Sequence, residues 1–98
     1  MSKVLVLEFA GVDAAHYSEA NKVLNFFPQT GEGDAPAGLQ AHIAGAGEGG
    51  AFTVVEVWES LEAHEEFMAT RLGPALAQAG IGAPTSVKWY DALSAYSV

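Results

Sequence analysis

The spacing of apolar residues along the chain predicts six elements. Four runs that are rich in β-branched and apolar residues are typical of strands: residues 3–9, 39–44, 51–59 and 86–93. Between Asp13, which can cap a helix, and Pro28, which ends one, apolar side chains recur every three or four positions. The same helical spacing follows Ser60, with a kink or restart at Gly73–Pro74 and an end at Gly80. The predicted order is strand, helix, strand, strand, helix, strand.

This order is the split βαβ pattern of a ferredoxin-like α+β sandwich (βαββαβ), in which two helices pack on one face of a four-stranded antiparallel sheet. The 98 residues suffice for one such domain, 1–98, and not for two independent cores. In strand 51–59 both sets of alternate residues are largely apolar, so neither face of the sheet is suited to water. We therefore expect a homodimer, in which a second copy of the sheet covers the free face.

The glycine run 45–50, GAGEGG, matches the GxGxxG pattern that holds a dinucleotide pyrophosphate at the N-terminus of a helix. The residues after Gly50 read AFTVVEVW, which is a strand and not a helix, and Glu48 would repel a phosphate. The run therefore predicts a hairpin turn between two antiparallel strands. We expect no nucleotide and no other cofactor.

Composition narrows the possible partners. Twelve Asp and Glu against four Lys and Arg give a net charge of −8, which repels nucleic acid and anionic membranes. The absence of cysteine excludes disulfides, thiolate metal sites and a cysteine nucleophile, and we expect no metal site. The N-terminal run MSKVLVLEF is too short for a signal-peptide core, so we expect a cytoplasmic protein that does not bind membranes.

Polar residues fall on one set of alternate strand positions. If the strands share a phase, one face of the sheet is mixed and lines a cavity; its members are Glu8, Gln40, His42, Glu56 and Trp58. The other face then packs through purely apolar residues; these are Leu5, Leu7, Leu39, Ala41, Ile43, Val55, Val57 and Trp89. The relative phase of the strands is not fixed by the sequence, so this grouping is a hypothesis.

Two histidines are candidate catalytic bases, because an imidazole titrates near neutral pH. His64 lies on the apolar stripe of the second helix, where it is either a base or a histidine satisfied by a carbonyl or water. His42 lies on a predicted edge strand, where the alternative to a base is a solvated or interface histidine. Neither position decides between the two interpretations.

Four residues are candidates for binding a substrate: Glu8, Glu56, Trp58 and Phe67. An unpaired carboxylate at Glu56, in a central strand, would be costly to ionise. Glu56 therefore either pairs with Lys88 or a histidine, or lines a wet cavity. Trp58, at the end of the strand, either stacks on an aromatic ligand or belongs to the core.

The passage VVEVWESLEAHEEF, followed by RLGPALAQAGI, resembles the dimeric α+β barrel superfamily, and within it the antibiotic-biosynthesis-monooxygenase-like group. The specific match covers roughly residues 54 to 81, while the element order matches over nearly the whole chain. The resemblance implies a homodimer that forms an α+β barrel, with a pocket in each subunit between the sheet and the second helix.

Two branches of that group have a known chemistry. In the cofactor-independent, quinone-forming oxygenases, a tryptophan over the substrate matches Trp58, whereas their asparagine falls at Val54 and their tyrosine at His64. The haem-degrading branch uses an asparagine, a tryptophan and a histidine; those places hold Glu8, Phe67 and Ala77. The resemblance is therefore closer to the first branch.

The predicted function is the binding of a small hydrophobic aromatic compound by a homodimer. In an enzymatic version, a cofactor-independent monooxygenase, His64 or His42 would take a phenolic proton and Trp58 would stack on the ring. The resulting carbanion would reduce oxygen without flavin or metal. Two alternatives stay open: a non-catalytic ligand-binding or interaction protein, and a haem-binding or haem-degrading protein.

Overall fold

The computed structural model describes residues 2–94 and 96. Its elements follow the predicted order, with one additional small hairpin. In chain order they are β1 (Lys3–Phe9), α1 (Ala14–Leu24), β2 (Phe26–Phe27), β3 (Glu32–Gly33), β4 (Leu39–Ala46), the 3₁₀ turn η1 (Glu48–Gly50), β5 (Phe52–Trp58), α2 (Leu61–Phe67), the π-helical segment η2 (Met68–Leu72), α3 (Gly73–Gln78) and β6 (Ser86–Asp91).

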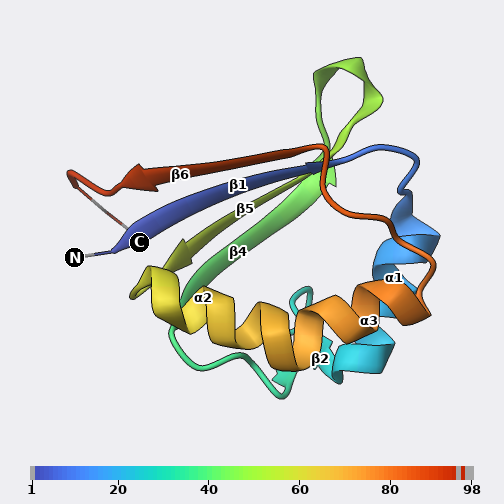
Figure 1. Ribbon diagram of the computed structural model, residues 1–98, viewed down its shortest axis with the longest axis horizontal. Helices are drawn as coiled ribbons and strands as arrows, with labels where there is room; N and C mark the ends of the chain where they lie inside the picture. Colours follow the sequence, from blue (N-terminus) through green and yellow to red (C-terminus); the bar gives the residue numbers. More distant parts are fainter. Residues whose placement is uncertain (1, 95, 97–98) are drawn as a thin grey trace.

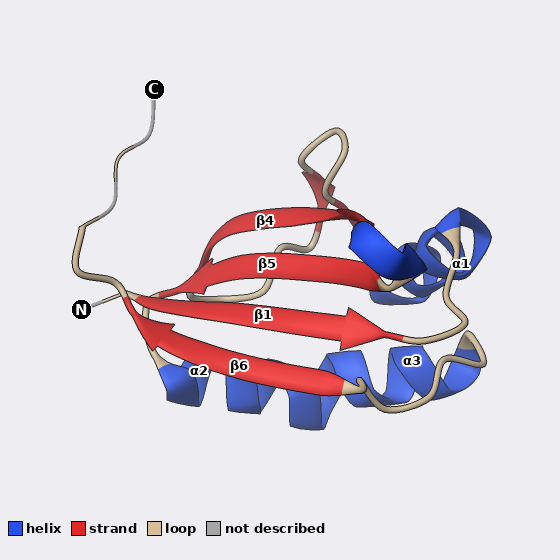
Figure 2. Ribbon diagram, turned by 90° about the horizontal axis from the view of Figure 1, so that it is seen from above, coloured by secondary structure: helices blue, strands red, loops and turns tan. Residues whose placement is uncertain are grey.

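Four strands form one antiparallel sheet in the order β4-β5-β1-β6 (Figure 2). The helices lie on one side of this sheet, with α2 and α3 running along it and α1 near its far end (Figure 1). This arrangement confirms the predicted ferredoxin-like α+β fold. Within the part of the chain that the structure describes, no helix is long and apolar enough to cross a membrane.

The first helix is shorter than predicted. It ends at Leu24, because Asn25 adopts a left-handed conformation (φ 54°), which asparagine tolerates better than most residues. Phe26 and Phe27, which lie in the predicted helix, instead pair with Glu32–Gly33 in a small hairpin. At Gly33 a Cβ atom would lie 2.2 Å from the carbonyl oxygen of Asn25, so only glycine fits there.

The second helix is interrupted at the predicted place without ending there. The Ser60 hydroxyl accepts a hydrogen bond from the backbone N–H of Ala63 (3.2 Å) and caps α2. The chain then widens into the π-helical segment η2 before Pro74, which has no N–H and crowds the preceding turn. The helix resumes as α3, and Gly80 (φ 74°) follows its end.

The glycine run is a hairpin, as the sequence predicts. Strands β4 and β5 pair antiparallel on either side of it, with Ala46 opposite Phe52. Gly49 and Gly50 have φ values of 78° and 84°, which the turn requires and a larger residue would resist. The strand after Gly50 leaves no helix N-terminus at which a pyrophosphate could bind.

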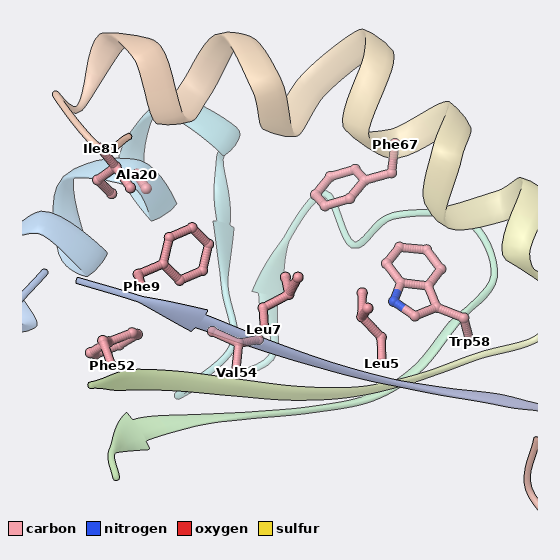
Figure 3. Close-up of a cluster of buried hydrophobic side chains, with 9 residues drawn as sticks. All are labelled: Leu5, Leu7, Phe9, Ala20, Phe52, Val54, Trp58, Phe67 and Ile81. Atoms are coloured by element: carbon pink, nitrogen blue, oxygen red, sulfur yellow. The ribbon is translucent and has the colours of Figure 1, made fainter. Parts of the chain in front are cut away.

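The core lies between the sheet and the helices. Figure 3 shows the side chains of Leu5, Leu7 and Phe9 directed from β1 toward the helical layer, where Phe67 meets Trp58. Leu5 and Trp58 are fully buried, and the aromatic rings of Trp58 and Phe67 are 5.7 Å apart. The full cluster comprises Leu5, Leu7, Phe9, Ala20, Phe52, Val54, Trp58, Phe67 and Ile81.

The predicted grouping of residues by sheet face is wrong for β1. The register places Leu5 opposite Glu56 and Glu8 opposite Thr53, so Leu5 and Leu7 share the helix-facing side with Glu56, and Glu8 does not. The alternate residues of β1 are therefore shifted by one position relative to those of β5, compared with the predicted grouping. The same register places Lys88 on the far face, opposite Val6.

A bulge between Leu39 and Ala41 changes the phase within β4. Leu39 pairs with Trp58 and Ala41 with Val57, so Gln40 is an extra residue in the ladder. Leu39 and His42 consequently both lie on the helix-facing side, although they are three positions apart. The predicted placement of Gln40 beside His42, and of Leu39 beside Ile43, is wrong for this reason.

The opposite face of the sheet carries no helix (Figure 1). Its residues are largely apolar, with Glu8 and Lys88 among the exceptions. Val4 and Val6 on β1 lie beside Val57 and Val55 on β5, and all four are partly exposed. Ile43 on β4 is 68% exposed and Tyr90 on β6 is 52% exposed. We call these six residues the open sheet face: Val4, Val6, Ile43, Val55, Val57 and Tyr90.

Leu5→Ala is expected to lower the free energy of unfolding by about 3 kcal/mol, because Leu5 is fully buried and its truncation leaves a cavity. Leu93→Ala is the matched control, since Leu93 is fully exposed and its loss should change stability by less than about 0.5 kcal/mol. Urea unfolding of both variants measures the difference. Equal stabilities would show that the sheet does not pack on the helices as described.

Candidate functional site

A chain of four hydrogen-bonded side chains crosses the interior between the sheet and α1. Glu56 of β5 and His42 of β4 are direct cross-strand partners on the helix-facing side. His42 Nδ1 lies 2.7 Å from Glu56 Oε2, and His42 Nε2 lies 2.6 Å from the hydroxyl oxygen of Tyr17 on α1. The indole Nε1–H of Trp58 donates to Glu56 Oε1 at 3.0 Å. Residues from three elements thus form the chain Tyr17–His42–Glu56–Trp58.

The direction of these hydrogen bonds follows from the donors available. The Trp58 indole can only donate, so Glu56 accepts from it, and an ionised Glu56 also accepts from His42 Nδ1–H. A neutral His42 with its proton on Nδ1 offers only an acceptor at Nε2, and Tyr17 donates its O–H to that nitrogen. In this assignment each hydrogen bond of the chain has one donor and one acceptor.

Pairing explains how a carboxylate can lie in the apolar core. Glu56 is 6% exposed, and an unpaired charge at that depth would be expensive. Of the alternatives that the sequence leaves open, the structure has Glu56 paired with a histidine and also lining a cavity; Lys88 lies on the other face. His42 is correspondingly well buried, with about 13% of its side chain exposed.

The polar chain borders an apolar cavity of about 70 Å³. Residues of β1, β4 and β5 form the sheet side of the cavity wall. Residues of α1 form another part, and Phe67, Leu72 and Leu76 contribute from the second helical region. Among the described residues that line the cavity, four are polar: Tyr17, Asn21, His42 and Glu56. None is a lysine or an arginine. The cavity is therefore mainly apolar with a few polar groups, a lining composition that is typical of small-molecule sites, although its volume is smaller than theirs.

Part of the cavity wall belongs to the loop between α1 and β4. Pro28 and Pro36 line the cavity, and Arg71 fixes this loop by donating to the backbone oxygens of Leu24 (3.0 Å) and Asp34 (2.6 Å). Asn25 also donates to the Asp34 carboxylate at 3.0 Å. The loop thus forms part of the cavity wall, and Arg71 ties it and the end of α1 to η2.

Tyr17 and Asn21 are site residues that the sequence analysis did not identify. They lie one turn apart on α1, and the sequence assigns Tyr17 to the apolar stripe of that helix. Asn21 is 5% exposed, and a buried amide on an otherwise apolar stripe is the signal that could have drawn attention to this face. Burial raises the pKa of Tyr17, and the charge of Glu56 adds to this effect, whereas the nearby Asn21 amide lowers it.

His64 lies apart from this cavity. Its ring is packed edge-on between Trp58 and Trp89, with centroid distances of 5.2 and 5.3 Å. It is 6% exposed, and its Nε2 atom has no hydrogen-bond partner within the described part of the chain. Burial lowers the pKa of His64, while the charges of Glu56 and Glu65 act in the opposite direction.

The other predicted site residues fall into two groups. His42, Glu56 and Phe67 line the cavity. Trp58 is fully buried, does not line the cavity and holds Glu56 through its indole N–H. Glu8 lies on the opposite face of the sheet, so the structure does not bring it to the cavity. Among the residues described, no group of three acidic, cysteine or histidine side chains is arranged to hold a metal ion.

Comparison with known proteins adds a fold-level relationship. No protein-family model matches the sequence, and no curated protein matches it. Solved structures do match. Rv0793 from Mycobacterium tuberculosis has a TM-score of 0.65 and 18% identity, with 99% of this chain and 100% of that chain covered.

Two further structures carry names that describe an activity. One is a Chloroflexus aurantiacus protein provisionally named an antibiotic biosynthesis monooxygenase (TM-score 0.67, 13% identity, 99% and 98% coverage). The other is SnoaB from Streptomyces nogalater, a cofactor-independent oxygenase (TM-score 0.59, 15% identity, 96% and 93% coverage). The fold is that of the antibiotic biosynthesis monooxygenase-like proteins. At these identities the likeness extends to the fold and not to the reaction.

The burial of His64 predicts a dependence of stability on pH. Its pKa is about 6.5 in the unfolded chain and lower in the folded protein, so between these two values the unfolded state binds more protons. Acidification from pH 7 should therefore destabilise the fold progressively below about pH 6.5, until the folded-state pKa is reached.

His64→Phe removes this titration and keeps an aromatic ring between the tryptophans, so its stability should fall less between pH 7 and pH 5 than that of the wild type. Urea unfolding across this range measures the difference. His16→Gln serves as the control, because His16 is partly exposed at the start of α1 and glutamine suits the same capping position. Parallel pH profiles for the wild type and His64→Phe would refute the assignment.

Proposed function

We propose that the protein binds a small, uncharged, hydroxyl-bearing aromatic compound in the cavity and removes its hydroxyl proton toward the His42–Glu56 pair. The observation that carries this proposal is the buried pair itself, which borders an apolar cavity. A histidine oriented by a carboxylate is the usual arrangement of a general base. The His42–Glu56 pair is the proton acceptor, and the cavity has room for the ligand that gives up the proton.

The cavity lining defines the class of ligand. Apolar walls favour an aromatic or aliphatic body, and the four polar side chains meet a single polar group. A carboxylate or phosphate would enter beside Glu56 without a lysine or arginine among the described lining residues to neutralise it. An uncharged hydroxyl compound therefore suits the site better than an anion.

The size of the cavity limits the ligand further. An apolar cavity of roughly 150 Å³ holds one benzene ring in another protein, and the cavity described here has about 70 Å³. A single ring thus requires some displacement of the walls, for which the loop bearing Pro28 and Pro36 is the least regular part. The same comparison disfavours haem, which is much larger than one ring.

Oxidation of the bound compound is the enzymatic extension of this proposal. A deprotonated phenol is electron-rich enough for a ring carbon or an activated CH₂ group to react with O₂. Conversion of the CH₂ to a carbonyl takes one oxygen atom from O₂ and releases the other as water, so no flavin or metal is needed for balance. SnoaB, a cofactor-independent oxygenase, has a similar fold, and this likeness of fold supports oxidation as the reaction.

A non-catalytic ligand-binding protein is the competing proposal, and the apolar cavity supports it as well. His42→Gln separates the two, because loss of a general base typically costs about 10²–10⁴-fold in rate whereas an apolar ligand still binds. Oxygen consumption should be measured with phenols of one to three rings and with anthrone, which carries a phenolic hydroxyl in its enol tautomer. His16→Gln is the matched control and should retain full activity, since His16 lies outside the cavity.

Equal oxygen consumption by the wild type and His42→Gln would exclude His42 as the proton acceptor. Ligand binding without any oxygen consumption would favour the non-catalytic protein.

The expected partner is a second copy of the chain. The open sheet face exposes a row of valines together with Ile43 and Tyr90, and an apolar surface of that kind on a sheet needs a cover. Packing of two such sheets face to face would close an α+β barrel, with one cavity on the outer, helical side of each sheet. The described sheet and helices place the cavity and the open sheet face on opposite sides of the strands.

Val55→Lys is expected to dissociate this dimer, because it places a charge in the middle of the open sheet face. Light scattering should give the mass of two 10.2 kDa chains for the wild type and of one chain for the variant. Ser18→Lys is the matched control, since it adds the same charge at an exposed position of α1. A wild-type mass of one chain would contradict the dimer.

A further inference from the structure

The nitrogens of His42 are both occupied. Nδ1 lies 2.7 Å from Glu56, and Nε2 lies 2.6 Å from the Tyr17 hydroxyl. Each ring nitrogen of a neutral imidazole makes one hydrogen bond in the plane of the ring. A ligand therefore cannot reach His42 directly unless one of its two partners moves away.

The Tyr17 hydroxyl, in contrast, can form a further hydrogen bond. Its hydroxyl donates its one proton to His42 and keeps oxygen lone pairs that can accept a hydrogen bond. Tyr17 lines the cavity, as does the Asn21 amide one turn along α1. The Tyr17 hydroxyl is therefore a polar group of the cavity lining that can accept a hydrogen bond from a ligand.

We propose that Tyr17 is the residue that contacts the substrate hydroxyl and that it relays the proton to His42; this rests on the proposed function. The substrate O–H bond breaks as a new O–H bond forms at Tyr17. The original Tyr17 O–H bond breaks as an N–H bond forms at His42 Nε2. The result is a substrate oxyanion, an unchanged neutral Tyr17 and an imidazolium ion paired with Glu56, so one proton has moved and no charge is lost.

The packing of Tyr17 is suited to such a role. Its ring lies 5.3 Å from that of Phe52 and stands nearly parallel to the imidazole of His42, with an interplanar angle of 13°. These contacts fix the direction of the hydroxyl before a ligand arrives, which is the condition for efficient proton transfer. Burial also raises the pKa of Tyr17, so the resting side chain keeps its proton and donates it to His42.

Asn21 completes the surroundings of the reacting oxygen. Its side chain is 5% exposed and lines the cavity, and its hydrogen bond to the Tyr17 hydroxyl lowers the pKa of Tyr17. An amide N–H that faces a developing oxyanion stabilises it. The substrate oxygen would thus lie between the Tyr17 hydroxyl and the Asn21 amide, and the substrate class narrows to compounds with a free aromatic hydroxyl.

The test uses 4-nitrophenol, a one-ring phenol whose ionised form alone absorbs visible light strongly. In the wild type, the bound probe should ionise with Tyr17 as donor to its oxyanion. In Tyr17→Phe that hydrogen bond is lost, and the ionisation constant of the bound probe should fall about tenfold or more. Tyr96→Phe is the control, because Tyr96 is 90% exposed and loses the same hydroxyl. Circular dichroism verifies that each variant folds.

Two results would overturn the relay alone. Tighter binding and stronger ionisation of the probe in Tyr17→Phe would show that the hydroxyl occupies the substrate position and must be displaced. Unchanged ionisation in that variant would show that the probe reaches His42 without Tyr17. Failure of the wild type to bind the probe would instead contradict the proposed function, and the relay with it.

Discussion

The carboxylate of Glu56, buried in the layer between sheet and helices, constrains the rest of the site. A charge at that depth requires partners, and the fold supplies two, the indole N–H of Trp58 and the Nδ1–H of His42. With Glu56 ionised and His42 neutral, the contact with Glu56 places the imidazole proton on Nδ1, and the Tyr17 hydroxyl then donates to Nε2. The orientation of each polar group thus follows from the burial of one carboxylate.

The two faces of the sheet have different roles. The helix-facing side combines the core with the cavity, and Leu7, Phe52 and Val54 belong to both. The opposite side is free of helices and apolar, which suits association between copies. An antiparallel sheet can serve both tasks because its side chains alternate, so residues for one task do not interfere with those for the other.

Much of the fold could be predicted from the sequence, because periodicity reports local structure. The alternation in Phe52–Trp58, the break at Pro74 and the glycine hairpin all depend on neighbours in the chain. The composition of the two faces could not be predicted, because it depends on register and on one bulge at Gln40. A bulge changes the phase of a strand without a clear signature in one sequence.

The contacts of the site could likewise be predicted only in part from the sequence. The need of Glu56 for a partner follows from its position in an apolar strand, and the sequence allows a histidine as that partner. The identity of that histidine could not be predicted, since His42 and His64 both suited a site facing the helices. Tyr17 lies 25 positions from His42 and has an aromatic ring that fits an apolar stripe, so its hydroxyl gave no separate signal.

The tautomer of His42 decides whether one chain of hydrogen bonds runs from Tyr17 through His42 to Glu56. Nitrogen-15 NMR of histidine-labelled protein at neutral pH distinguishes a protonated ring nitrogen from an unprotonated one. We expect His42 to carry its proton on Nδ1, with Nε2 unprotonated and accepting from Tyr17. A proton on Nε2, with Nδ1 unprotonated, would reverse the direction of the chain and rule out Tyr17 as the donor.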